Sequence, residues 1–245
     1  MNKCRLVLSL LTLLLTVNVQ AYWQGEPLVG VSVDYARYDG RYDIGLFYTG
    51  FPIVPKTDYQ DRQRNTGFGG GALLGYQFIC NDWVLGAELS ADWFDTNKER
   101  VFVFTDQINA LAWDTALQAR NKGFYGLSAR VGYYMAPFFM SYVRVGVETV
   151  HQEITARFNG APGVYPFGLT LKDNSWQNHV FVGVGAEFPL PLFCQLSLRM
   201  EYNYHFPSAT LQGRGRILDG VVNPAFSVEA RPSIDTGKVS LIWNF

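Results

Sequence analysis

Residues 83–93 read WVLGAELSADW, and apolar and polar side chains alternate along this stretch. A period of two is the spacing of a β-strand, in which successive side chains point to opposite faces. One face carries Trp83, Leu85, Ala87, Leu89, Ala91 and Trp93, and the other carries Val84, Gly86, Glu88, Ser90 and Asp92. The length matches the roughly 9–11 residues that a tilted transmembrane strand needs. The stretch is therefore predicted to cross a bilayer with its apolar face toward lipid.

The same alternation recurs in seven further segments, so eight strands are predicted. They are residues 28–38, 67–78, 124–135, 139–150, 176–188, 194–206 and 237–245. Charged residues keep to one face of each, and outward aromatic residues fall at the strand ends, as in the interfacial girdles of membrane barrels. A soluble β-sandwich or lipocalin-like barrel also alternates, but its apolar face points inward, and exposed aromatic ends would favour aggregation.

The joins between these segments alternate in length. Three are short, at residues 79–82, 136–138 and 189–193, whereas the other four, at residues 39–66, 95–123, 151–175 and 207–236, have about 25 residues each. Short turns at one rim and long loops at the other are typical of outer-membrane barrels. The sequence thus predicts an all-β fold: an eight-stranded antiparallel transmembrane up-and-down β-barrel with four long extracellular loops and short periplasmic turns.

Hairpin partners must point to the same side, because a slip of one residue would turn an apolar face inward. The predicted registers keep every apolar face outward by pairing Phe78 with Trp83, Met135 with Phe139 and Phe188 with Cys194.

The first 21 residues have the pattern of a secretory signal peptide. Lys3 and Arg5 precede an apolar run over residues 6–17, and Val19-Gln20-Ala21 is a small-residue cleavage pattern. The run is too short for a membrane-spanning helix, which needs about 20 residues. Residues 1–21 are therefore predicted to be removed after Ala21, and residues 22–245 to form the barrel. Only 17% of residues are charged, below the roughly 25% of soluble domains, which also favours a partly lipid environment.

The last segment, KVSLIWNF at residues 238–245, is the most specific one. With the signal peptide and the eight strands, it resembles the small eight-stranded outer-membrane proteins of Gram-negative bacteria, namely the OmpA-type transmembrane domain and opacity-type surface proteins. The resemblance implies that Val239, Leu241, Trp243 and Phe245 form the signal that the barrel-assembly machinery reads. It also implies a location in the bacterial outer membrane, contact with its lipid and lipopolysaccharide, and exposed loops that bind an unidentified extracellular or host ligand.

The inward faces carry acids and bases in near balance. They include Asp34, Glu88, Arg130, Arg144, Glu148, Glu187, Arg199, Glu201 and Lys238. Eight strands leave a lumen that side chains just fill, so these residues are predicted to form a packed ion-pair network. Arg130 is expected opposite Arg144, with Glu88 and Glu148 as neutralising neighbours. The alternative is that these groups line a narrow ion path, and the inward glycines are compatible with both.

Signals for catalysis, metals or cofactors are weak. His151 and Glu153 are too few for a metal site, and a hydrogen bond between His179 and Glu201 is expected to be structural. Lipid A deacylases and palmitoyltransferases share the eight-stranded fold and need a serine near a histidine. The nearest approach is His205 and Ser208, with Pro207 interrupting the strand between them.

Other motifs give no cofactor either. Residues 67–72 read GFGGGA, a dinucleotide-like pattern, but a strand rather than a helix follows, so no helix N-terminus is present to bind a pyrophosphate. Cys80 and Cys194 are predicted too far apart for a disulfide. The net charge of −1 gives no basic footprint for nucleic acid. The sequence therefore predicts a monomeric, non-catalytic surface protein that supports envelope integrity and surface interactions, with a small porin as the alternative and a lipid-modifying enzyme as a third possibility.

Overall fold

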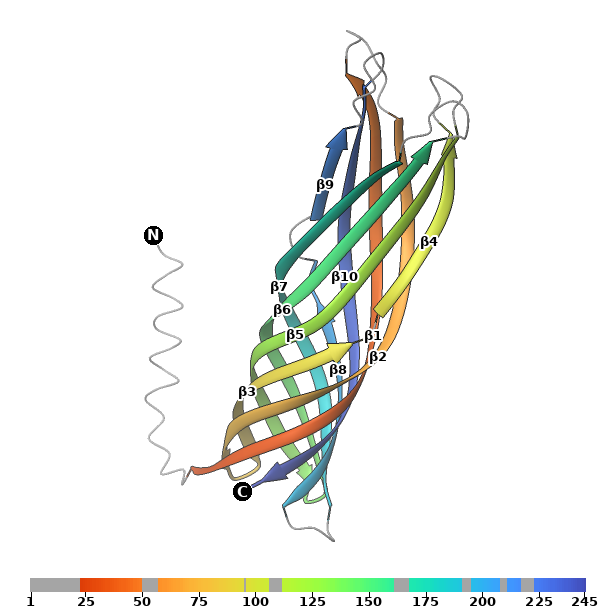
Figure 1. Ribbon diagram of the computed structural model, residues 1–245. Coiled ribbons are helices and arrows are strands. Elements are labelled where there is room, and N and C mark those ends of the chain that lie inside the picture. The colour runs from red at the N-terminus through yellow and green to blue at the C-terminus, as the bar shows by residue number, and fades with distance from the viewer. Residues whose placement is uncertain are drawn as a thin grey trace, which may run out of the picture.

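The computed structural model describes residues 23–49, 57–94, 96–105, 112–160, 168–190, 195–207, 211–216 and 223–245 (Figure 1). Its elements are β1 (Gln24–Thr49), β2 (Thr57–Cys80), β3 (Trp83–Phe94), β4 (Thr96–Thr105), β5 (Ala112–Ala136), β6 (Phe139–Gly160), β7 (Gly168–Pro189), β8 (Leu196–His205), β9 (Leu211–Arg216) and β10 (Asn223–Asn244). Within these ranges there is no helix of the length and apolarity that crossing a membrane requires. The predicted signal peptide lies outside the described residues, as do Cys4 and Cys194.

Eight of the strands form a ring. Neighbours along the sheet are β1, β2, β3, β5, β6, β7, β8 and β10, and an antiparallel pairing of β1 with β10 joins the two ends of this order. The sheet winds around a central axis (Figure 1), and each of these neighbouring pairs is antiparallel. The predicted eight-stranded antiparallel fold is confirmed.

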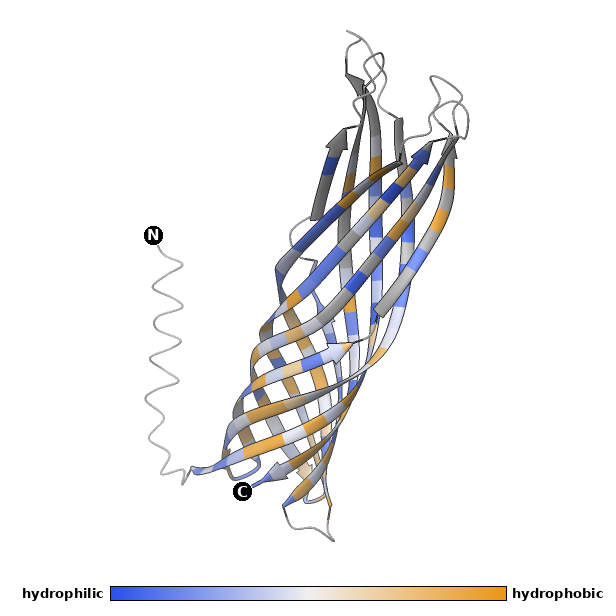
Figure 2. Cartoon of the chain, in the orientation of Figure 1, coloured by the Kyte–Doolittle hydropathy of each residue, from blue (hydrophilic) through white to orange (hydrophobic). Residues whose placement is uncertain are grey.

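The outer wall of the ring is apolar. Five cross-strand neighbours form a row around it, each between 48% and 60% exposed: Leu74, Leu89, Leu127, Val147 and Val180. Apolar residues recur throughout the lower half of the strands (Figure 2). This outward apolar surface is the band expected to contact lipid.

Aromatic side chains mark both rims of this band. Ring centroids lie 5.1–5.9 Å apart in Trp83–Tyr133 and Phe139–Phe188 near the short turns, and in Tyr35–Phe68 and Tyr125–Trp176 at the opposite rim. Such girdles stabilise a barrel at the two membrane–water interfaces, where amphipathic rings partition.

We expect the substitution Leu89→Arg to destabilise the barrel by about 2–4 kcal/mol, because it places a guanidinium at mid-bilayer, halfway between Trp83 and Trp93. Urea titrations of folding in phospholipid vesicles would measure the loss. Glu99→Arg is the matched control, because Glu99 is exposed on β4 beyond the apolar band. Equal stability of the two variants would contradict the assignment of the lipid-facing side.

Two hairpin registers differ from the prediction. Trp83 pairs with Cys80 rather than Phe78, and Phe188 pairs with Leu198 rather than Cys194. Alternation determines which face is outward but leaves shifts by an even number of residues undetermined. At the first turn, Asn81 has a φ of 53°, a conformation that Asn tolerates, so a tight turn over residues 81–82 sets the register.

The third hairpin follows its predicted register over most of its length. Arg130 lies opposite Arg144, as expected. A register shift next to the turn then places Ala136, rather than Met135, opposite Phe139.

The four joins predicted as long loops are mostly strand, which corrects the sequence interpretation. β1 continues to Thr49, β6 to Gly160, and β4 and β9 lie wholly within predicted loops. Beyond the lipid band the outward face of a strand contacts water rather than lipid and carries polar residues, so the outward apolar pattern disappears while the backbone ladder continues. We call the part of the strands beyond Tyr35, Phe68 and Phe94 the outer extension.

The outer extension is divided into two sheets. β9 pairs with β10 and β4 pairs with β5, which gives the orders β2-β1-β10-β9 and β4-β5-β6-β7. Both sheets carry buried apolar side chains: Tyr42, Ile44 and Val228 in the first, and Leu117, Phe158 and Leu171 in the second. The extension therefore has an apolar interior of its own above the barrel.

Candidate functional site

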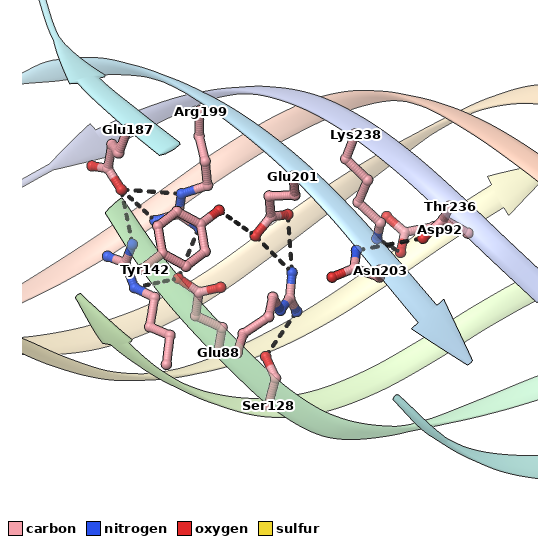
Figure 3. A network of polar contacts seen from close by, with 12 residues as sticks. Glu88, Asp92, Ser128, Tyr142, Glu187, Arg199, Glu201, Asn203, Thr236 and Lys238 are labelled. Atoms are coloured by element: carbon pink, nitrogen blue, oxygen red, sulfur yellow. Dashed lines mark hydrogen bonds and ion pairs between the residues drawn. The ribbon is translucent and has the colours of Figure 1, made fainter. Parts of the chain in front are cut away.

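Four charged side chains form a closed ring inside the barrel. Arg130 lies 3.0 Å from Glu88 and 2.8 Å from Glu187, and Arg199 lies 2.8 Å and 3.0 Å from the same two carboxylates (Figure 3). Each of the four side chains is at most 2% exposed. In a low-dielectric interior, charges persist only when they are paired, and here each cation bridges both anions.

Tyr142 lies between the two guanidinium groups of this ring. Its ring centroid is 5.5 Å from Arg130 and 5.6 Å from Arg199, within the range of cation–π attraction. Its hydroxyl donates a 2.6 Å hydrogen bond to Glu201, which links the ring to the next group of charges.

A second pair lies one step toward the outer extension. Arg144 donates hydrogen bonds of 2.9 Å to both oxygens of Glu201 and one of 2.8 Å to Ser128 (Figure 3). Its guanidinium is also 5.0 Å from the ring centroid of Phe181. The expected neutraliser, Glu148, lies one step further along and instead contacts His205 at 2.7 Å.

A third group contains Lys238, Asp92 and Asp34. The Lys238 ammonium donates to Asp92 across the lumen, and Asp34 is the register partner of Lys238 on β1. All three residues are at most 5% exposed. The predicted charge-network residues other than Glu148 therefore lie in three neighbouring buried groups, which Asp92 joins, and Glu148 is buried beside His205.

Two apolar layers flank these charges, and beside the first of them Gln77 connects Arg130 to Glu26 and Asn244 through hydrogen bonds. Val84, Met140 and Tyr142 pack toward the short turns, with Ile79 and Tyr134 against them. Toward the outer extension lies a second layer of Ala36, Tyr38, Phe94, Phe124, Val150 and Ile234. Along the inward face of β3 the order is Val84, Glu88, Asp92 and Phe94, so the charged region lies between the two layers.

Inward glycines make room for the long charged side chains. A Cβ atom at Gly86 would lie 3.0 Å from Arg130 Nε, and one at Gly183 would lie 2.9 Å from Arg144 Cγ. The space beside these two glycines is thus occupied by arginine side chains.

The contacts of the two inward histidines, His179 and His205, differ from those predicted from the sequence. His179 lies opposite Glu148 in register and contacts the Phe206 carbonyl at 3.2 Å, whereas Glu201 is bound by Arg144 and Tyr142. The histidine–carboxylate pair is His205 with Glu148. Alternation along β8 places His205 on the same inward face as Glu201, which is a sequence signal for this pair. Pro207 indicated the start of a loop instead.

The other candidate functional residues predicted from the sequence lie outside these buried groups. His151 stacks on Trp176 at 4.8 Å, and Glu153 pairs with Lys172 at 2.7 Å. The part of the chain that the structure describes contains no group of three potential metal ligands. The glycine-rich residues 67–72 lie within β2, and Cys80 is a buried free thiol, while Ser208 lies outside the described residues.

The C-terminal residues of the predicted assembly signal point outward. Val239, Leu241 and Trp243 are 43–44% exposed and Phe245 is 61% exposed, and the rings of Trp243 and Phe245 are 6.2 Å apart. Their β-strand partners on β1 include Val33 and Val31, so they extend the lipid-facing wall.

Comparison with known proteins identifies one matching family and several similar solved structures. The family described as outer membrane protein beta-barrel domain matches residues 7–216. Among solved structures, Ail of Yersinia pestis, in complex with the heparin analogue sucrose octasulfate, is 14% identical over 90% of this chain and 99% of that chain, with a TM-score of 0.37.

Two further solved structures are similar. OprG of Pseudomonas aeruginosa is 13% identical over 92% of this chain and 99% of its own, with a TM-score of 0.41. The outer membrane protease OmpT of Escherichia coli is 9% identical over 90% and 97%, with a TM-score of 0.42. No curated protein matches the chain.

Proposed function

The chain belongs to the outer membrane protein beta-barrel family, and we propose on that premise that it is a sealed, non-catalytic barrel that holds its outer extension at the bacterial surface for recognition. In this proposal the barrel anchors the protein in the outer membrane and positions the outer extension, and the outer extension binds the ligand. Residues 1–21 are a signal peptide that is removed after Ala21, and the mature barrel is a monomer that contributes to envelope integrity.

The packed lumen is the observation that carries this proposal. Glu88, Arg130, Glu187 and Arg199 neutralise one another across the full width of the interior. The apolar layer of Ala36, Tyr38, Phe94, Phe124, Val150 and Ile234 adds a further barrier that hydrated ions cross only at a high desolvation cost. These features favour a closed barrel over the alternative, a small porin.

The lipid environment supplies further partners. Outer-membrane lipid surrounds the apolar band, and Arg37, Arg41, Arg62 and Arg64 are exposed just beyond the girdle residues Tyr35 and Phe68, where lipopolysaccharide phosphates would meet them. The barrel-assembly machinery reads Val239, Leu241, Trp243 and Phe245. An extracellular or host molecule is the ligand of the extension.

We expect purified wild-type protein to conduct weakly or not at all when it is reconstituted in planar bilayers. The reason is that the arginines and the lysine in the lumen are each paired with a carboxylate, so they are fixed in place and fill the interior. Single-channel recordings in potassium chloride, with the heat-unfolded protein as the control, are the measurement. Large, stable and reproducible openings would instead establish the porin alternative.

A labelling experiment tests the orientation in the membrane. We expect a Thr66→Cys variant to react with a membrane-impermeant maleimide on intact cells, because Thr66 is exposed in the outer extension. Asp82→Cys, in the exposed short turn, should react only after the outer membrane is permeabilised. Wild-type protein, whose Cys80 is buried, is the background control. Labelling of Asp82→Cys alone on intact cells would invert the topology.

A further inference from the structure

The lipid-facing wall of the barrel carries a groove that runs across β5, β6, β7 and β8. The groove has a volume of about 550 Å³. Its lining includes outward valines of β6 and β7 and the backbone of Gly183, with Tyr202 and Tyr204 of β8 at one end. We call it the β6–β7 groove. The valine and tyrosine side chains that line it point to the face of the sheet opposite the charged groups of the lumen, so it is a separate feature.

Side-chain size accounts for the groove. The lining residues form two adjacent rows of cross-strand partners, Ala129–Val145–Val182–Tyr204 and Val131–Val143–Val184–Tyr202. Each row has short side chains on three strands and a large ring on the fourth, so a step forms where the valines meet the tyrosines. The next row toward the outer extension has the longer Leu127 on β5, opposite Leu89 of β3. The concavity therefore follows from the small residues at these particular positions.

The groove leads from the middle of the bilayer toward the outer rim. Ala129 lies halfway between the two aromatic residues that mark the rims on β5. Its row of partners continues from Tyr204 to Asp235 on β10 and then to Arg37 on β1. Arg37 lies beyond the girdle residue Tyr35, so the row passes from apolar to polar surroundings at the outer interface. An occupant of the groove therefore enters from the outer leaflet and ends near the bilayer centre.

The dimensions of the groove decide what kind of molecule it holds. Its lining takes two outward residues from each strand, which is a strand length of about 7 Å. A transmembrane helix is about 10–12 Å wide with its side chains and crosses about 30 Å of hydrocarbon. A second barrel would need to bury on the order of 1,000 Å² for a stable interface. A single acyl chain needs neither, and in a groove it contacts protein on more than one side, which adds dispersion contacts.

We propose that the β6–β7 groove is a lipid-binding site that holds one acyl chain of lipopolysaccharide. The chain lies along the valines with its end near Ala129, and its head group lies beside Tyr204 at the outer interface. Lipopolysaccharide is the source because the groove opens toward the outer leaflet, which this lipid forms in the bacterial outer membrane. The inference rests on the proposed function and deepens it, since it names the place on the barrel where a surrounding lipid is held.

Photo-crosslinking in living cells tests the site. The photoreactive amino acid p-benzoylphenylalanine replaces Tyr202 at the groove, or Trp93 on β3 as the matched control, in the full-length protein. These two side chains are 52% and 53% exposed, and both point outward. After illumination, lipopolysaccharide adducts are detected on gels with an antibody and identified by mass spectrometry. We expect at least about fivefold more lipopolysaccharide adduct at position 202, because a chain held in the groove stays within reach of the photoreactive group.

A filling variant tests the groove itself. Val182→Trp places a large ring on the floor and should reduce the adduct at position 202 to the level found at position 93. Val33→Trp, at an exposed position on the lipid-facing side of β1, should leave the adduct unchanged. Heat-modifiable migration on gels shows whether each variant is folded, and the comparison between the two crosslinking positions stands without either variant.

Three results would overturn the proposal. Equal lipopolysaccharide adducts at the two positions would mean that only exchanging lipid covers this wall. Predominant phospholipid adducts at position 202 would refute lipopolysaccharide as the source of the chain, and predominant protein adducts would show a protein interface instead. A conducting wild-type barrel would refute the sealed lumen while leaving the lipid adducts intact, so the two failures are distinguishable.

Discussion

Replacing Arg199 by methionine is expected to lower the free energy of unfolding by about 3–5 kcal/mol, because it leaves Glu88 and Glu187 with a single cation between them. The Arg199 side chain is fully buried, and three of its nitrogen atoms contact these two carboxylates. Methionine preserves most of the volume, so the loss reports the unpaired charge rather than a cavity. Urea unfolding in lipid vesicles, followed by tryptophan fluorescence, measures it.

A compensating substitution separates charge from packing. Adding Glu187→Gln to Arg199→Met leaves one cation and one anion, Arg130 and Glu88, which are 3.0 Å apart. The double variant should recover most of the lost stability. As a surface control, Arg62→Met should leave the unfolding midpoint nearly unchanged, because this guanidinium is exposed. If Arg199→Met behaved like Arg62→Met, the interior would have to be hydrated rather than packed.

The inside and outside of the barrel could be predicted from the sequence, but the ion pairs could not. Alternation shows that Arg144 and Glu201 both face inward, because the face on which a residue lies depends only on its position in the alternating pattern of its own strand. Which carboxylate meets which guanidinium depends on reach across the lumen. Arg199 on β8 contacts Glu88 on β3, which is not a neighbouring strand, and Arg144 reaches Glu201 past the glycine-bearing β7.

The strands of the outer extension could not be predicted from the sequence for a related reason. An alternation with its apolar face outward marks only the strand segments whose outward face contacts lipid. Along residues 37–43 of β1 the outward face carries Arg37, Asp39, Arg41 and Asp43, so a charged strand looks like a polar loop. The inward face does carry Tyr38, Tyr42 and Ile44, which are buried. Inverting the expected polarity, with charges outside and apolar groups inside, would have identified this soluble part of the fold.

Removing Arg130 and Arg144 together, as Arg130→Ala with Arg144→Ala, is expected to produce small, brief, cation-selective openings in planar bilayers. Glu201 then loses its ion-pair partner, and Glu88 and Glu187 share only Arg199. Water entering the vacated space is the least costly way to solvate these carboxylates, and the lumen gains two negative charges relative to the wild type. The openings should stay brief, because the apolar layer around Phe124 still crosses the lumen.

Selectivity and charge dependence make this prediction specific. Arg130→Lys with Arg144→Lys keeps both positive charges and shortens both side chains, so it should remain closed or open far more rarely than the alanine variant. Reversal potentials in a potassium chloride gradient would measure the selectivity of any openings. Anion-selective openings, or equal opening of the lysine and alanine variants, would show that lost volume rather than unpaired carboxylates admits the ions. The ion-pair network would then be a structural filler, and the two apolar layers would be the barrier that closes the barrel.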